Sequence, residues 1–298
     1  MKRFLPIKII IGFTTIILVG CGGGSESSSS SSSSATPAAA ISLTTPAGTP
    51  CTSNFNNTDA FGNTRFEVSG TGFGTEKPWS CLVVDKANNQ PVYSGTQSVR
   101  FETRPGDCFV GIGGYDDCAN DRSHNDLMAT QRKSTQGQII TYEYYMYLPS
   151  QPLITPPSAK GCYSTTATLL AQINWINKIG TSYGQLLEPR IDETGLFLNP
   201  QLDWTFANGP KVPLDSNPYN KWIKLKYVIK STASADGYVQ VYMNDQLVYN
   251  QTRATLPGTD YQHMLKIGFY YGQIYCATQP WQTQGVYFDG ISTTVQNF

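Results

Sequence analysis

The stretch WIKLKYVIK, residues 222–230, alternates between two kinds of side chain. One set of alternate positions is apolar throughout and consists of Ile223, Leu225, Tyr227 and Ile229. The other set has lysine at three of its five positions. Because successive side chains in a β-strand point to opposite faces, this pattern predicts a strand with one face in a core and the other mostly in water.

The segments around this strand follow the same alternation. GYVQVYMNDQLVYN, residues 237–250, contains two such runs joined at Asn244 and Asp245, which tolerate the positive φ of a tight hairpin turn. Further strands are expected at residues 98–103, 138–149, 167–175, 185–191, 264–271 and 285–293. With no long helical pattern among them, these runs predict an all-β fold in which two sheets form a sandwich of the jelly-roll type.

The first 42 residues differ in composition from the rest. Residues 1–20 have a basic start, an apolar run and small residues before Cys21, which is the pattern of a bacterial lipoprotein signal peptide. A membrane-spanning helix is the alternative, but the apolar stretch from Ile9 to Gly20 is shorter than the ~20 residues that a bilayer requires. We expect a lipid on Cys21, a flexible Ser/Gly-rich tether over residues 21–42, and a single domain over residues 43–298.

The chain carries 21 basic and 21 acidic residues, and loss of Lys2, Arg3 and Lys8 with the signal leaves 18 basic residues. This balance excludes a generally basic nucleic-acid binder, although a locally basic groove is compatible with it. We therefore expect no nucleic-acid partner, contact with a membrane only through the lipid, and a monomer. The expected location is the bacterial cell envelope or the secreted fraction. Gly22, rather than an aspartate, follows the cysteine and favours the outer membrane.

Six cysteines remain after Cys21, and an even number in an exported protein indicates up to three disulfides. The favoured pairs are Cys108 with Cys118, Cys51 with Cys81, and Cys162 with Cys276. Their spacing lacks the CxxC pairs and nearby histidines of a zinc site, so no metal centre is predicted. The acidic segment YDDCANDR, residues 115–122, could hold a structural calcium ion through Asp116, Asp117 and Asp121, although it lacks a recognised calcium-loop spacing. No cofactor is expected to be required.

Polar residues recur at alternate positions within two expected strands. In MLKIGFYYGQ, residues 264–273, Lys266, Gly268 and Tyr270 share one face, and Gly268 would leave space for a ligand to approach the backbone. In ATLLAQINW, residues 167–175, Gln172 and Asn174 share a face with Leu170. The opposite, apolar face of this second run is expected to be Leu169, Ala171, Ile173 and Trp175. Such faces fit a ligand groove, and an ordinary polar strand surface is the alternative.

A third segment, RSHNDLM at residues 122–128, brings three chemically versatile residues onto one face if it is extended. These are Arg122, His124 and Asp126. Arginine pairs with carboxylates through a rigid fork, and histidine exchanges a proton near neutral pH. The alternative is a surface histidine on an arginine-rich strand.

The chain from about Ser98 to Ser292 resembles polysaccharide lyases of the heparin-lyase, glucuronan-lyase and alginate-lyase type. The resemblance lies in the order of SVRFETRPGD, DRSHNDL, YEYYMYLP, AQIN, DGYVQVYMNDQLV, LKIGFYYGQ and VYFDGI. It implies a concanavalin-like β-jelly roll with a concave groove. It also implies β-elimination of an anionic, uronic-acid polysaccharide such as glucuronan, alginate or a glycosaminoglycan, by a late tyrosine, a glutamine on a middle strand and usually a histidine.

The family's motifs map onto this sequence with two departures. The K-x-G-x-Y motif falls on Lys266, Gly268 and Tyr270. The Q-I-H motif of the alginate-lyase branch falls on Gln172, Ile173 and Asn174, so asparagine replaces the histidine. The R-x-E-L motif falls imperfectly on residues 122–127, with Asp126 at the glutamate position. Because the glucuronan-lyase branch carries its histidine ahead of the glutamine, the resemblance implies His124 as the functional histidine. His263 is expected to lie in a loop.

The resemblance assigns catalysis to His124, Gln172 and Tyr270. Tyr270 would protonate the leaving oxygen, and either His124 or deprotonated Tyr270 would be the base, depending on whether proton and oxygen leave from the same side of the sugar. Gln172 and Asn174, with Arg122, would donate hydrogen bonds to the uronate carboxylate, where negative charge grows. Lys266 would either lower the pKa of the tyrosine or hold the carboxylate of the next sugar. Further substrate-binding cations are expected among Arg100, Arg104, Arg132 and Arg190, with solvated surface charge as the alternative.

Two non-catalytic functions stay open. One is a carbohydrate-binding surface lipoprotein on the same fold, which Asn174 in place of histidine favours, and the other is a lectin-like adhesin without preference for uronates. Tyrosine and tryptophan rings that stack on sugars would serve either function. A hydrolase would need two carboxylates flanking the scissile bond, and no ExDxxE-like strand is present.

Overall fold

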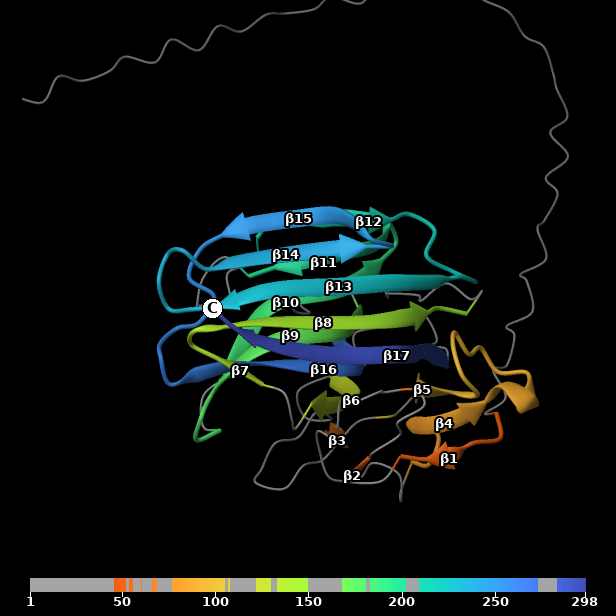
Figure 1. Cartoon of the computed structure of the whole chain (residues 1–298). Coiled ribbons are helices and arrows are strands. Elements are labelled where there is room, and N and C mark those ends of the chain that lie inside the picture. Colours follow the sequence, from red (N-terminus) through yellow and green to blue (C-terminus); the bar gives the residue numbers. More distant parts are fainter. Residues whose placement is uncertain are drawn as a thin grey trace, which may run out of the picture. The chain divides into compact units, whose positions relative to one another are not determined.

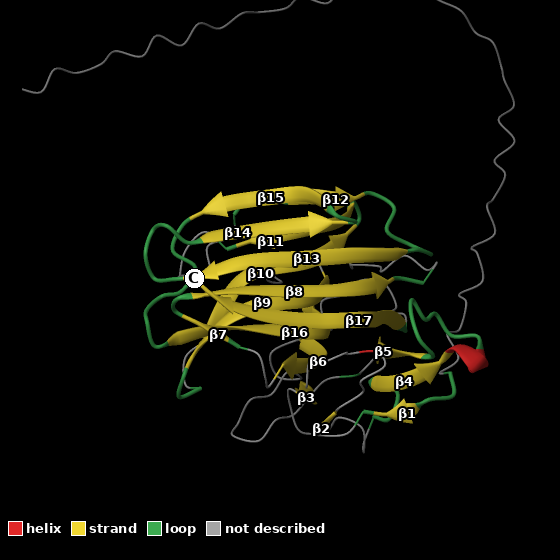
Figure 2. Ribbon diagram, viewed as in Figure 1, coloured by secondary structure: helices red, strands yellow, loops and turns green. Residues whose placement is uncertain are grey.

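The computed structural model describes residues 46–51, 54–55, 60, 66–68, 77–104, 107, 122–129, 133–149, 168–180, 183–201, 209–272 and 283–298. These residues belong to one compact unit, Ile41–Phe298. Most of them lie in β-strands, which form two stacked layers (Figures 1 and 2). Within these ranges, no helix is long and apolar enough to cross a membrane.

The first sheet has eight strands in the spatial order β1-β4-β5-β17-β8-β13-β14-β15. Their bounds are β1 Thr49–Pro50, β4 Cys81–Asp85, β5 Gln97–Thr103, β17 Gln284–Asn297, β8 Gln138–Tyr147, β13 Trp222–Ser231, β14 Tyr238–Met243 and β15 Gln246–Thr252. A short 3-10 helix, η1 (Lys86–Asn88), follows β4. All ladders between these strands are antiparallel.

The second sheet has nine strands, eight of them in the order β12-β11-β10-β9-β16-β6-β3-β2, and β7 pairs with one end of β16. Their bounds are β12 Val212–Asp215, β11 Gly195–Pro200, β10 Tyr183–Asp192, β9 Thr168–Asn177, β16 Tyr261–Gly272, β6 Arg122–Ala129, β3 Phe66–Val68, β2 Asn54–Phe55 and β7 Ser134–Thr135. The strands β9, β16 and β6 lie side by side in its middle.

The segment that predicts the fold, residues 222–230, forms β13 between β8 and β14. Its four apolar positions are completely buried, whereas the alternate positions are partly exposed. The four apolar residues belong to one buried cluster with Leu265, Ile267 and Phe269 of β16, so the core lies between the two sheets. The prediction of an all-β, two-sheet sandwich is confirmed.

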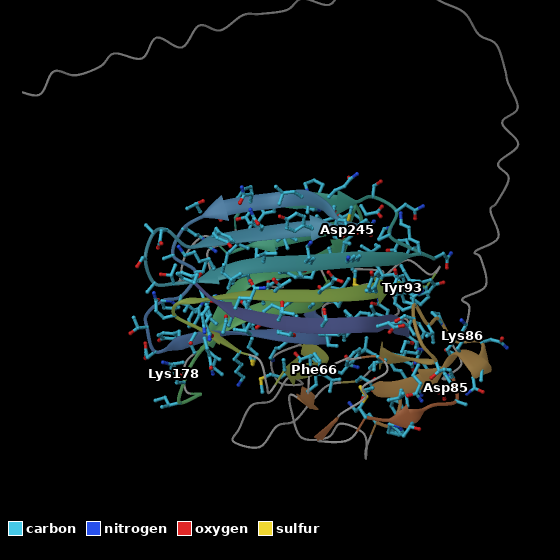
Figure 3. The ribbon with its side chains drawn as sticks, viewed as in Figure 1. Phe66, Asp85, Lys86, Tyr93, Lys178 and Asp245 are labelled. Atoms are coloured by element: carbon cyan, nitrogen blue, oxygen red, sulfur yellow. A yellow bond between two sulfur atoms is a disulfide. The ribbon has the colours of Figure 1, made fainter. Side chains whose placement is uncertain are left out.

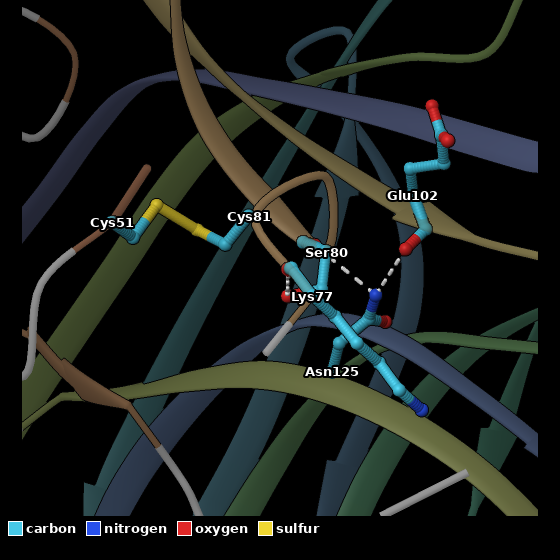
Figure 4. The surroundings of a disulfide bond; sticks show 6 residues. All are labelled: Cys51, Lys77, Ser80, Cys81, Glu102 and Asn125. Carbon is cyan, nitrogen blue, oxygen red and sulfur yellow. Dashed lines mark hydrogen bonds between the residues drawn. A yellow bond between two sulfur atoms is a disulfide. The ribbon is translucent and has the colours of Figure 1, made fainter. Parts of the chain in front are cut away.

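Two local predictions are also confirmed. Asn244 and Asp245 have φ values of 48° and 67° and form the turn between β14 and β15, where Figure 3 labels Asp245. Cys51 and Cys81 form a disulfide, with Cα atoms 5.4 Å apart (Figure 4). The other four predicted disulfide cysteines, Cys108, Cys118, Cys162 and Cys276, lie outside the described residues, as does the acidic segment 115–121.

A buried asparagine joins the two sheets near this disulfide. The side chain of Asn125, on β6, donates hydrogen bonds to two backbone oxygens of the other layer (Figure 4). One belongs to Ser80, directly before β4, and the other belongs to Glu102 on β5. Burying a polar amide is costly unless it is hydrogen-bonded. These two hydrogen bonds therefore favour one packing position of β6 against β5.

His263 corrects an expectation, because it lies on β16 and is completely buried rather than in a loop. Its Nε2 is 2.9 Å from the carbonyl oxygen of Thr255, which can only accept, so Nε2 carries the proton. Its Nδ1 lies 2.9 Å from the Ser231 hydroxyl and 3.2 Å from the Ser134 hydroxyl. Burial lowers the pKa of His263 to about 4, so the neutral imidazole is part of the fold.

Candidate active site

A row of polar side chains crosses the middle of the second sheet, on the face turned away from the first sheet. Neighbouring residues along the strands, such as Ala171, Ile173 and Ile267, belong to the core on the other face. From β11 to β6 the row runs Asn199, Glu188, Gln172, Lys266 and Asp126. The register pairs Glu188 with Asn199, and Gln172 with Lys266, so these residues are direct neighbours on adjacent strands.

A small, open pocket lies on this row. It is lined by Asp126, Leu169, Ala171, Gln172, Lys266, Ile267, Gly268, Phe269 and Tyr270.

Glu188 accepts hydrogen bonds from three side chains of the sheet, and the sequence patterns do not predict it as a site residue. Its carboxylate is completely buried and accepts hydrogen bonds from Gln172 Nε2 at 3.0 Å, Asn199 Nδ2 at 3.2 Å and Arg190 Nε at 2.9 Å. Arg190 Nη2 also donates to it. A buried charge requires such partners. Glu188 and Arg190 stand two residues apart in a strand, a spacing that places them on one face and could have indicated the pair.

Lys266 and Asp126, both members of the row, form a second ion pair at the site. Lys266 Nζ lies 3.3 Å from Asp126 Oδ2, and the two side chains are 17% and 7% exposed. Both residues line the pocket. A lysine therefore lies next to Gln172, with its charge offset by a neighbouring aspartate.

Gly268 is crowded rather than open. Its φ is +140°, and a Cβ atom there would lie 2.2 Å from the backbone oxygen of Asn125 and 2.6 Å from the Cα of Asp126. The glycine lets β16 adopt this backbone conformation against β6. The missing side chain therefore makes room for β6, and the expectation that Gly268 borders a ligand site agrees with its place in the pocket lining.

Tyr270 and His124 are register partners on β16 and β6. Tyr270 is partly exposed and lines the pocket together with Gln172 and Lys266. Of Arg122 and His124 the structure describes only the strand positions, which lie on β6. Directly paired residues of an antiparallel ladder have Cα atoms about 4.5–5.5 Å apart, so position 124 is adjacent to the tyrosine.

The alternation expected for residues 167–175 is wrong at its start. Leu170 belongs to the core, whereas Leu169 lines the pocket and pairs with Tyr270. The cause is a register shift between Ile267 and Tyr270, where β16 has one more residue than β9. Leu169 is thus a pocket residue that alternation alone assigns to the wrong face.

Three predicted ligand-binding residues take different positions. Asn174 lies on the Gln172 face but is only 1% exposed and does not line the pocket. Arg100 lies on β5 of the other sheet, is 1% exposed and is paired with Glu102, so it is not part of this site. Arg104 binds the same glutamate. Arg132 lies outside the described residues, and the described chain contains no cluster of ligands for a metal ion.

Comparison with known proteins identifies a family and a fold that the chain resembles. The sequence model of a family described as polysaccharide lyase matches residues 71–292. No curated protein matches the sequence significantly. Among solved structures, the endo-β-1,4-glucuronan lyase from the fungus Trichoderma reesei has 14% identity and a TM-score of 0.53, covering 79% of this chain and 92% of that chain. Alginate lyase A1-II′, a member of polysaccharide lyase family 7, has 15% identity and a TM-score of 0.49, covering 72% and 90%.

The likeness to the glucuronan lyase bears on the fold, and it agrees with the predicted jelly-roll sandwich. The family match bears on the chemistry, because it extends over well more than half of the chain and includes β6, β9 and β16. The chain therefore belongs to the polysaccharide lyase family, and it is a carbon–oxygen lyase that acts on polysaccharides.

Proposed function

We propose that this lyase cleaves a uronic-acid polysaccharide by β-elimination at the pocket between β9, β16 and β6. The observation that carries the proposal is the meeting of an amide, an ammonium and a phenol in one pocket, from Gln172, Lys266 and Tyr270. These groups match the needs of the reaction, which are stabilisation of a carboxylate, binding of an anion and transfer of a proton.

Charge stabilisation is the first need. The reaction removes the proton on C5 of a uronate, next to a carboxylate that is already negative, so the intermediate concentrates negative charge on that group. An N–H of Gln172 would donate a hydrogen bond to this carboxylate, and the Lys266 ammonium would offset its charge. Because Asp126 and Glu188 partly balance the charges of Lys266 and Arg190, the site would act mainly through oriented donors, which are worth on the order of 3 kcal/mol each in comparable enzymes.

Proton transfer is the second need. Tyr270 would donate its phenolic proton to the glycosidic oxygen on C4 as the C4–O bond breaks. The base that takes the C5 proton would be His124, the register partner of Tyr270, if the proton and oxygen leave from opposite sides of the ring. If both leave from the same side, Tyr270 in its deprotonated form would take the C5 proton first and return it to the oxygen.

The test is to incubate the protein with glucuronan, alginate, heparin, hyaluronan and ulvan and to follow two signals. The expected result is ultraviolet absorbance from unsaturated uronate ends, in step with new reducing ends, on at least one polymer. Reducing ends without absorbance would mean hydrolysis and would contradict the proposal. Cleavage of neutral polysaccharides alone would contradict the uronate preference.

A further inference from the structure

We propose that Glu188 is a positioning residue, which holds the side-chain amide of Gln172 in the one orientation that serves the reaction. This inference rests on the proposed function, because it concerns how Gln172 faces the uronate carboxylate. Glu188 itself is completely buried and does not line the pocket, so it would act through Gln172 rather than on the substrate.

The first step concerns the direction of the amide. A carboxylate only accepts hydrogen bonds, so the NH2 end of Gln172, and not its oxygen, must face Glu188 Oε1, 3.0 Å away. Turning the amide by 180° would bring two acceptor oxygens together and would leave buried groups unsatisfied, which is unfavourable. The second N–H and the carbonyl oxygen of Gln172 are then fixed in direction as well.

The second step concerns the carboxylate, which is itself immobilised. Its other oxygen, Oε2, accepts hydrogen bonds from Arg190, two residues along β10, and from Asn199 on β11. The donors that hold it therefore come from three neighbouring strands, β9, β10 and β11. Arg190 directs Nε and Nη2 at Glu188, and its side chain is only 13% exposed. We assign Arg190 and Asn199 the role of holding Glu188, in place of the substrate contact expected for Arg190.

The third step concerns the consequence for catalysis. Donors accelerate a reaction when they already point at the developing charge and need no reorganisation. Without an acceptor-only partner, Gln172 could present either end of its amide, and part of the population would place an oxygen against the substrate carboxylate. The loss should therefore fall on kcat more than on KM.

The main experiment is a double-mutant cycle with Glu188→Gln and Gln172→Ala on the polymer that the wild type cleaves. Glu188→Gln is expected to lower kcat about 10- to 100-fold, the range that loss of a supporting hydrogen-bond partner costs in other sites. KM should stay within about threefold. In the Gln172→Ala background, Glu188→Gln should cause no further loss of kcat, because the residue through which Glu188 acts is absent. An equal loss in both backgrounds would overturn the inference.

Glu102 offers a matched control. Like Glu188 it is completely buried and paired with an arginine two residues away, but it lies on β5 of the other sheet. Glu102→Gln should leave kcat unchanged even if it lowers stability. A comparable loss of kcat in Glu102→Gln would show that disturbing any buried ion pair produces the effect, which would also overturn the inference.

A second readout does not depend on activity. In nuclear magnetic resonance spectra, the side-chain amide signals of Gln172, identified by their loss in Gln172→Ala, should shift in Glu188→Gln and stay in place in Glu102→Gln. If Glu188→Gln does not fold, Glu188→Asp retains the charge opposite Arg190 but withdraws the oxygen from Gln172, and it should shift the same signals. Unshifted signals would contradict the inference. A wild type that cleaves no polyuronate would contradict only the proposed function.

Discussion

A Cβ atom at Gly268 would lie 2.6 Å from the Cα of Asp126, so β16 and β6 meet at the pocket without room for a side chain between them. Along β16 the glycine lies between Lys266, which pairs with Asp126, and Tyr270. The glycine of the K-x-G-x-Y motif is therefore structural in this chain.

Gly268→Ala should destabilise the protein by at least about 2 kcal/mol, because it combines backbone strain with overpacking against a strand. Gly137 provides the control, since its φ is +85° but a Cβ there would meet no atom within 4 Å. Gly137→Ala should show the cost of strain alone. Urea unfolding of both variants measures the difference, and equal losses of stability would contradict the close contact of β16 and β6.

Tyr270→Phe should abolish cleavage, lowering kcat by about 10²–10⁴-fold, which is the usual contribution of a general acid or base. Binding of the polymer should persist, because the ring and its contacts remain. Cleavage assays with binding measured in parallel by calorimetry separate the two effects. Retention of full activity would exclude the phenol from proton transfer.

His124→Ala distinguishes the two candidate bases. If the imidazole removes the C5 proton, kcat should fall about 10²–10⁴-fold, and the limb of the pH–rate profile that belongs to the base should disappear. An unchanged rate would contradict the role of His124 and would leave Tyr270 as both base and acid. The profile is recorded for wild type and variant on the same polymer.

Strict alternation predicts the strands of this fold well. All four apolar positions of residues 222–230 are fully buried in β13, and the predicted hairpin turn has its two positive φ values at Asn244 and Asp245. The side-chain period of two holds as long as pairing is uninterrupted, and β13 pairs with both of its neighbours without a register shift. In β13 the sequence alone is therefore enough to predict which side chains are buried.

Alternation fails where the ladder is irregular. Leu169 faces the pocket and Leu170 the core, and the adjacent residues Leu186 and Leu187 are both buried in the core beside a register shift in β10. A bulge depends on how the neighbouring strand pairs, so local sequence does not reveal it. The predicted faces of β9 were therefore only partly correct.

The ion pairs show a second limit of sequence reasoning. Arg100 with Glu102, and Glu188 with Arg190, have the same spacing and the same burial of the glutamate. One pair lies on the first sheet and the other lies beside Gln172. Only the topology of the sheets separates a structural pair from one at the site, so Arg100 was expected at the site and Glu188 was not.

Stability should depend on pH through His263. Because burial lowers its pKa from 6.5 to about 4, the unfolded chain binds a proton below pH 6.5 that the native protein does not. The contribution of neutral His263 to the free energy of unfolding is therefore complete above pH 6.5 and is lost as the pH falls toward 4. Between pH 6.5 and 5 the free energy of unfolding should fall by about 2 kcal/mol from this residue.

His263→Gln removes this titration, so its unfolding free energy should vary less over the same range, although it starts lower. Urea unfolding at several pH values measures both curves. Parallel curves for wild type and variant would contradict the burial of a neutral imidazole.

The arrangement proposed for the site can be observed in a crystal structure of Tyr270→Phe bound to an oligosaccharide of the polymer that the wild type cleaves. We expect one uronate in the pocket, with its carboxylate hydrogen-bonded to Gln172 and its C4 oxygen beside the ring at position 270. His124 should lie within reach of C5 if it is the base. A sugar bound on another surface, or a uronate whose carboxylate points away from Gln172, would contradict the site.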